Sequence, residues 1–217
     1  MNNYKYVTRG ELFPVKQNLL QIINTARNQI YDEFTFQIYF VGSVEHNMVT
    51  FNAGTNIGYD FDVNILVNST SDHLTAKEIR IKIKNAIDRA AIRFGYAHAE
   101  DSTRVITIKF KDKKNSRILH SCDFAIVNDY IDKNGYRGQQ YIHFNKKQNQ
   151  YFWEEQSRGS YLLSEKADWI KGIGRWTEVR TLYLEKKNHN NDKHKRSRSI
   201  YAETIHEICQ KYRYYDC

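Results

Sequence analysis

The chain has 217 residues, of which 41% are hydrophobic and 27% are charged. This balance is ordinary for a folded protein with a buried core, and it excludes disorder throughout the chain. Lysine and arginine outnumber aspartate and glutamate by 33 to 25, and the resulting formal net charge of +8 favours anionic partners such as nucleotides or nucleic acid.

The cysteine pattern and the N-terminal segment both favour a cytoplasmic protein. Cys122, Cys209 and Cys217 show no Cys-x-x-Cys spacing and no even number that would suggest a disulfide framework. The N-terminal residues contain no apolar secretory core, and no uncharged run reaches the length of a membrane span. We therefore expect a soluble, unprocessed protein in the cytoplasm, without a membrane partner.

The first part of the chain predicts alternating helices and strands. Between Leu12 and Tyr31 apolar residues recur every three or four positions, which is typical of an amphipathic helix. The runs Phe36–Val41 and Asp60–Val67 are rich in β-branched and aromatic residues and predict two strands joined by a polar loop. Residues 68–72 offer helix caps, and a second long helix is predicted from Leu74 to Phe94.

Two carboxylates open the second of these strands. Since successive side chains of a strand point to opposite faces, Asp60 and Asp62 share one face, and Phe61 and Val63 share the other. Like charges at this spacing repel each other, and a divalent cation such as Mg²⁺ would offset the repulsion. The Asp-x-Asp tripeptide is also common at solvated strand ends, so the pair alone does not identify a metal site.

Two other features strengthen the hypothesis of a metal and phosphate site. Gly42 and Ser43 end the preceding strand, where a flexible turn with a hydroxyl and backbone N–H groups could hold phosphate oxygens. Asp123 lies within the apolar run from Ile118 to Val127, which predicts a strand that follows another one at Arg104–Lys111. A carboxylate in the middle of such a strand is costly unless it is paired or bound to a metal.

Taken together, Gly42-Ser43, Asp60-Phe61-Asp62 and Asp123 resemble the Gly-Ser, Asp-x-Asp and Asp pattern of the DNA polymerase beta type nucleotidyltransferase superfamily. The Gly-Ser strand end and the Asp-Phe-Asp-Val form look most like the branch that contains cyclic GMP-AMP synthase, the oligoadenylate synthetases and their bacterial relatives. The order of the predicted elements agrees with an α+β fold, in which a mixed β-sheet carries helices on one face.

The resemblance implies a metal-dependent enzyme that transfers a nucleoside monophosphate from a nucleoside triphosphate to an acceptor hydroxyl and releases pyrophosphate. By this resemblance Asp60 and Asp62 bind two Mg²⁺ ions, with Mn²⁺ as a possible substitute, and Asp123 completes the site of the metal that activates the acceptor. Gly42 and Ser43 would cradle the triphosphate. The acceptor stays open between a second nucleotide, an RNA end and a small-molecule hydroxyl.

From Gln148 onward the pattern changes to helix. We expect residues 1–145 to form the catalytic core and residues 146–217 to form a C-terminal helical lobe packed on it. Gly172 and Gly174 separate two of the expected helices, and the last helix is predicted at Ser199–Tyr214. The aromatic and aliphatic side chains expected to pack these helices together include Tyr151, Phe152, Leu162, Leu163, Trp169, Ile170, Trp176, Val179, Leu182 and Leu184.

A basic run from Lys186 to Arg198 precedes the last predicted helix. Such a run is usually a solvated loop. The segment also resembles the helix, loop and Ser-Tyr-bearing helix that hold the triphosphate in oligoadenylate-synthetase-like enzymes. By that resemblance Lys186 or Lys187 would neutralise phosphate, and Ser199 and Tyr201 would contact phosphate and base.

Other functions have less support. The histidines are scattered without a His-x-x-x-His pair, which disfavours a zinc hydrolase, and no Gly-x-Ser-x-Gly turn marks a nucleophilic serine. On the strand prediction Cys122 points into the core of the sheet. The competing hypothesis is a non-catalytic basic module with the same fold that binds nucleotides or RNA.

Overall fold

The computed structural model describes residues 2–68, 73–133, 135–156, 159–192 and 194–214. Its contacts divide the chain into two units. The core unit comprises Val7–Phe51 and Thr55–Gln156, and the helical unit comprises Met1–Tyr6, Asn52–Gly54 and Ser157–Cys217.

A seven-stranded sheet organises the core unit. Its strands are β2 (Phe36–Val41), β4 (Ile57–Val67), β5 (Glu100–Asp101), β6 (Val105–Asp112), β7 (Arg117–Ile131), β8 (Arg137–Asn145) and β9 (Gln150–Glu155). The order is β2-β4-β7-β6-β5, with β8 paired to both β7 and β9. Strands β4 and β7 are parallel and the other pairs are antiparallel, so the sheet is mixed, as predicted. A further short strand, β3 (Thr50–Asn52), lies outside this sheet.

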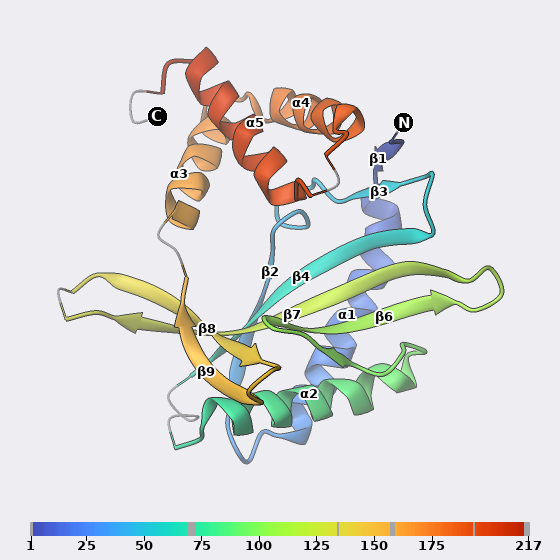
Figure 1. Ribbon diagram of the computed structural model, residues 1–217, viewed down its shortest axis with the longest axis vertical. Helices are drawn as coiled ribbons and strands as arrows, with labels where there is room; N and C mark the ends of the chain where they lie inside the picture. Colours follow the sequence, from blue (N-terminus) through green and yellow to red (C-terminus); the bar gives the residue numbers. More distant parts are fainter. Residues whose placement is uncertain (1, 69–72, 134, 157–158, 193, 215–217) are drawn as a thin grey trace. The chain divides into compact units, whose positions relative to one another are not determined.

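Helices α1 (Arg9–Gln29) and α2 (Ala76–Arg93) pack against one face of this sheet (Figure 1). Each begins with a capping box. The threonine side chain accepts a hydrogen bond from the backbone N–H of the glutamate three residues later, and the glutamate carboxylate accepts one from the backbone N–H of the threonine. Thr8 and Glu11 form this box in α1, and Thr75 and Glu78 form it in α2. The cap of α2 is therefore Thr75 and not Asn68, the one described residue of the 68–72 segment that was predicted to offer caps; residues 69–72 lie outside the described residues.

The alternation of side chains along β4 separates the core from the open face of the sheet. Phe61, Val63 and Ile65 are fully buried in one apolar cluster with residues of α1 and α2. Asp60 is exposed and Asp62 is partly buried on the opposite face. Because the acids share a face that the two helices do not cover, they are held on a rigid strand without entering the apolar core.

The expectation of helix from Gln148 onward is wrong for its first residues. Tyr151 and Phe152 lie in strand β9, opposite Phe144 and His143 of β8. The Tyr151 ring stacks on Phe144 with centroids 4.2 Å apart, and Phe152 stacks on His143 at 4.8 Å. Such cross-strand aromatic pairs stabilise a hairpin, and a short aromatic run carries no periodicity that separates strand from helix.

The helical unit contains α3 (Gly159–Gly172), α4 (Trp176–His189), α5 (Ser197–Lys211) and the short N-terminal strand β1 (Tyr4–Tyr6). The N-terminal segment is tied to α4, since the Tyr6 hydroxyl donates to the Arg180 carbonyl at 2.6 Å and the Tyr4 N–H donates to Asn188 Oδ1 at 2.6 Å. Across the described residues, every helix falls short of the length and apolarity that a membrane crossing requires.

Candidate functional site

The register between β4 and β7 places the three predicted acids together. Asp62 is the direct partner of Asp123 in this parallel pair, and Asp60 is the partner of Ser121. Residues in register project to the same face of a sheet. All three carboxylates therefore lie on the face opposite α1 and α2, on the two strands at the centre of the sheet.

Two hydroxyl groups orient two of these carboxylates. Ser121 Oγ donates to Asp60 Oδ1, and Thr107 Oγ1 donates to Asp123 Oδ1 at 2.5 Å. Thr107 lies on β6 directly opposite Asp123. Neither hydroxyl residue was predicted from the sequence. The only signal for them is their strand pairing with the acids, which the chain alone does not display.

Asp62 and Asp123 bind protons more tightly than carboxyl groups exposed to water. Burial raises the pKa of Asp62 to about 6, and the neighbouring charges of Asp123 and Asp60 add to this rise. Burial also raises the pKa of Asp123, partly opposed by the hydrogen bond from Thr107. Crowded carboxylates with raised pKa values are the local electrostatics that a cation or a positively charged ligand relieves.

A lysine lies beside the acids on the same face. Lys109 of β6 is opposite Ser121, and its Nζ donates to Glu100 Oε2 at 2.6 Å. Its positive charge acts to lower the pKa of Asp123, although burial of that carboxyl has the larger effect. Lys109 is thus a cationic group near the acids that the sequence analysis did not single out.

The Gly42-Ser43 turn lies beside the carboxylate of Asp62. Val41 is the register partner of Asp62, so the chain leaves β2 directly beside this carboxylate. Gly42 has a φ of +67°, and a Cβ on it would stand 2.9 Å from Asp62 Oδ2. The turn then closes through the Met48 N–H, which donates to the Ser43 carbonyl at 2.7 Å. Glycine is required here both for the left-handed backbone and for the close approach to the acid.

A divalent cation fits the chemistry of this donor set, since Mg²⁺ binds carboxylate oxygens and offsets their repulsion. As the side chains stand, however, the described residues contain no group of three or more His, Cys, Asp or Glu side chains that could hold a metal ion. Two of the carboxylates are instead directed to the hydroxyls of Ser121 and Thr107.

The residues beneath the acids, on the core face of β7, are inert. Cys122 is fully buried, and burial raises the pKa of its thiol well above the ordinary value. Burial lowers the pKa of His120 to about 4, so its ring is neutral near pH 7. His120 shares a 2.9 Å hydrogen bond with the Tyr96 hydroxyl and stacks on Phe110 with centroids 5.1 Å apart. Neither group is placed to act as a nucleophile or a surface base.

The residues expected to bind the triphosphate from the C-terminal region all belong to the helical unit. Lys186 forms an ion pair with Glu207 at 2.6 Å. Lys187 is buried, with its Nζ 4.0 Å from the centroid of the Tyr4 ring. Ser199 is exposed in the first turn of α5, and the Tyr201 ring meets the Tyr183 ring edge-on at 6.3 Å. Among these four side chains, Ser199 is the exposed one.

No family model matches the sequence, and no curated protein matches it either. Solved structures do match the fold. DncV, the cyclic AMP-GMP synthase of Vibrio cholerae, is 12% identical, with a TM-score of 0.60 over 92% of this chain and 67% of the synthase. The STING-associated CdnE c-di-GMP synthase of Capnocytophaga granulosa is 18% identical, with a TM-score of 0.53 over 92% of this chain and 61% of the synthase.

A third similar structure is the CdnE cyclic dinucleotide synthase of Elizabethkingia meningoseptica, at 14% identity and a TM-score of 0.50 over 88% of this chain and 67% of the synthase. The chain thus spans about two thirds of the length of these enzymes. At this level of identity the similarity concerns the fold. This chain therefore has the α+β fold of these cyclic dinucleotide synthases.

Proposed function

We propose that this protein is a nucleotidyltransferase that transfers a nucleoside monophosphate from a nucleoside triphosphate to an acceptor hydroxyl. The observation that carries the proposal is the convergence of Asp60, Asp62 and Asp123 on one sheet face beside the Gly42 turn. The fold supports it, since the similar synthases from V. cholerae and E. meningoseptica were captured with a pppA(3′,5′)pG intermediate and with GTP.

In the proposed reaction the acceptor oxygen attacks the α-phosphorus of the triphosphate. The bond between that phosphorus and the oxygen bridging to the β-phosphate breaks, and pyrophosphate leaves with the bonding electron pair. Asp123, whose raised pKa suits it to take up a proton, accepts the proton of the attacking hydroxyl. Thr107 holds the Asp123 carboxylate in a fixed direction, and the Gly42-Ser43 turn lies against the triphosphate.

The carboxylates of the site would suit Mg²⁺, or Mn²⁺ in its place. Asp60, Asp62 and Asp123 would hold it, and it would supply charge neutralisation for the triphosphate. The hydroxyls of Thr107 and Ser121 engage only Oδ1 of Asp123 and of Asp60, so the second oxygen of each carboxylate would stay available to the cation.

A second candidate is a non-catalytic module that binds nucleotides or RNA through positive charge. The net charge of +8 and the lack, among the described residues, of a preformed group of three metal ligands favour it. Calorimetry with a non-hydrolysable triphosphate separates the two functions. A catalytic site binds much more weakly when Mg²⁺ is withheld, whereas a basic groove binds almost equally well in both conditions.

The proposal is tested by incubating the protein with ATP, GTP, CTP and UTP in the presence of Mg²⁺ and identifying the products by mass spectrometry. We expect a product one nucleoside monophosphate heavier than its acceptor, together with pyrophosphate. Adding RNA ends and small hydroxyl compounds in separate reactions identifies the acceptor class. No product with any acceptor, combined with triphosphate binding that does not depend on Mg²⁺, would favour the binding module.

A further inference from the structure

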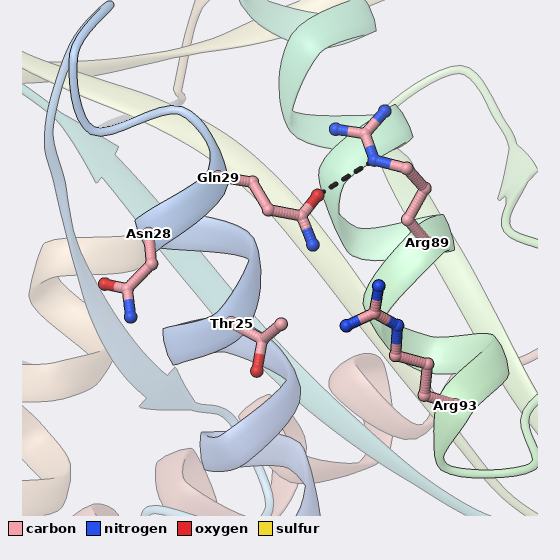
Figure 2. Close-up of a pocket in the computed structure, with 5 residues that line it drawn as sticks. All are labelled: Thr25, Asn28, Gln29, Arg89 and Arg93. Carbon is pink, nitrogen blue, oxygen red and sulfur yellow. Dashed lines mark hydrogen bonds between the residues drawn. The ribbon is translucent and has the colours of Figure 1, made fainter.

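A groove lies between α1 and α2 of the core unit (Figure 2). It has a volume of about 490 Å³, and its lining side chains are Thr25, Asn28 and Gln29 of α1 and Arg89 and Arg93 of α2. The groove is open to solvent, since four of its five lining residues are exposed and Thr25 is partly buried. Since α1 and α2 cover the sheet face opposite the three carboxylates, the groove is separate from the proposed catalytic centre.

Every side chain that lines the groove carries an N–H or O–H donor, and none is a carboxylate. Figure 2 shows the guanidinium groups of Arg89 and Arg93 both directed toward α1. Arg89 Nε donates to Gln29 Oε1 at 2.9 Å, which leaves its terminal nitrogens for other acceptors. Within the part of the chain that the structure describes, Arg93 makes no hydrogen bond, ion pair or ring contact.

Three other basic side chains on these two helices have partners. Lys82 forms an ion pair with Glu33, and Arg80 forms one with Asp101. Lys16 lies over the Phe40 ring at 4.7 Å. Arg89 and Arg93 instead stand one helical turn apart on the same face of α2, where like charges repel each other. An anion in the groove would remove this repulsion and take up the unused donors.

We propose that this groove is a binding site for a small anion that carries phosphoryl groups. A phosphoryl group offers several oxygens and up to two negative charges, so two guanidinium forks can share it, whereas one fork already satisfies a carboxylate. The hydroxyl of Thr25 and the amide of Gln29 also line the groove and provide further polar groups. No aromatic ring lines the groove, so recognition rests on the phosphoryl oxygens rather than on stacking with a base.

The test is calorimetric titration of the full chain with pyrophosphate and, separately, with ADP, in EDTA to remove divalent cations. The test variants are Arg89→Gln, Arg93→Gln and the double substitution. Lys77→Gln is the matched control, because it removes one exposed positive charge from α2 outside the groove. Circular dichroism and melting without ligand verify that each variant is folded.

We expect the double variant to bind pyrophosphate about tenfold more weakly or worse, and Lys77→Gln to bind it nearly as well as the unchanged protein. Replacing both arginines by lysine keeps the positive charge but removes the two-pronged hydrogen bonding of the guanidinium group. We therefore expect an affinity for pyrophosphate between those of the unchanged protein and the double glutamine variant. Equal affinity for pyrophosphate and ADP would show that an inorganic phosphoryl anion is enough for binding. Tighter binding of ADP would identify the ligand of the groove as a phosphate ester.

Unchanged binding in the double variant would overturn the proposal, and so would an equal loss in the lysine control, which would reveal only general attraction to a basic surface. Binding of RNA in the absence of any pyrophosphate or ADP binding would also overturn it. The titration uses no activity readout, so its outcome is independent of whether the protein transfers nucleotides.

Discussion

Asp62 carries the largest electrostatic cost among the candidate site residues. It is partly buried, it faces Asp123 across the sheet, and it shares its strand face with Asp60. These surroundings raise its pKa from 3.8 to about 6. At neutral pH the ionised carboxylate of Asp62 is therefore less stable in the folded protein than in the unfolded chain. A residue that lowers the stability of the fold in this way is typical of a functional site.

We predict that Asp62→Asn stabilises the protein while it abolishes transfer. A carboxyl whose pKa is raised on folding lowers the free energy of unfolding as the pH rises above its unfolded pKa, so removing its charge raises stability in that range. Without divalent cations at pH 8 the gain should be on the order of 1–3 kcal/mol, and it should vanish near pH 3. Urea denaturation at both pH values measures it. A loss of stability at pH 8 would contradict the electrostatic account.

Gly42→Ala should destabilise the turn and disturb the neighbouring acid. Alanine at a φ of +67° costs about 1–2 kcal/mol, and its Cβ would stand 2.9 Å from Asp62 Oδ2. Gly135→Ala is the matched control, since Gly135 has a φ of +80° and no atom lies within 4 Å of the added Cβ. Both variants should lose stability, but only Gly42→Ala should also reduce transfer. An equal effect of both substitutions on transfer would show that the contact with Asp62 does not matter.

At the residue scale the sequence predicted a site formed by the three acids and the Gly42-Ser43 turn, and the strand register places these residues close together. The sequence did not identify Thr107, Ser121 or Lys109. A threonine, a serine or a lysine on a strand is unremarkable by itself, and these residues gain their positions beside the acids only from the pairing of β6 with β7. That register depends on contacts between segments far apart in the chain, which local patterns do not encode.

At the scale of elements, Arg80 links helix α2 to the strands. Its guanidinium is completely buried and forms an ion pair with Asp101 at 2.6 Å. It also donates to the carbonyls of Ser102, Val105 and Ile142 at 2.7, 3.1 and 2.8 Å. One side chain thus satisfies the carbonyl groups at the start of β6 and in β8, and it fixes the sheet against α2.

Replacing Arg80 by methionine should be strongly destabilising. The substitution leaves Asp101 without its buried partner and removes the donor from several carbonyls, which together cost about 3–5 kcal/mol. Lys82→Met is the control on the same helix, because its ion pair with Glu33 is partly exposed and contributes at most about 1 kcal/mol. Chemical denaturation of both variants measures the difference. Similar losses in the two variants would mean that Arg80 does not act as the link.

The long amphipathic helices and the strands with alternating patterns were predictable from the sequence, and their boundaries agree within a few residues with α1, α2, β2 and β6. The β8–β9 hairpin was not. Its second strand contains Tyr151 and Phe152, and these residue types are compatible with a helix as well as with a strand. Only their pairing with β8 distinguishes the two structures. Aromatic residues occur in both helices and strands, so the secondary structure of this segment depends on the strand with which it pairs and not on its own sequence.

At the scale of the whole molecule, the fold class was predictable because the order of helices and strands permits few arrangements. The proposed phosphate contacts of the helical unit stay a prediction. Lys186 and Lys187 are basic residues at the expected place in the sequence, but in the structure each is engaged within its own unit, by Glu207 and by the Tyr4 ring. Sequence reasoning finds charges readily, whereas the partners of those charges depend on packing.

The most direct test of the central claim is the rate of pyrophosphate release from a nucleoside triphosphate, measured for the unchanged protein, for Asp123→Asn and for Asp129→Asn. Both aspartates lie on β7, but Asp129 is exposed and accepts a hydrogen bond from Gln139, away from the other acids. We predict that Asp123→Asn lowers the rate by about a hundredfold or more and that Asp129→Asn leaves it unchanged. Equal rates for the two variants would contradict the assignment of Asp123 to a catalytic centre.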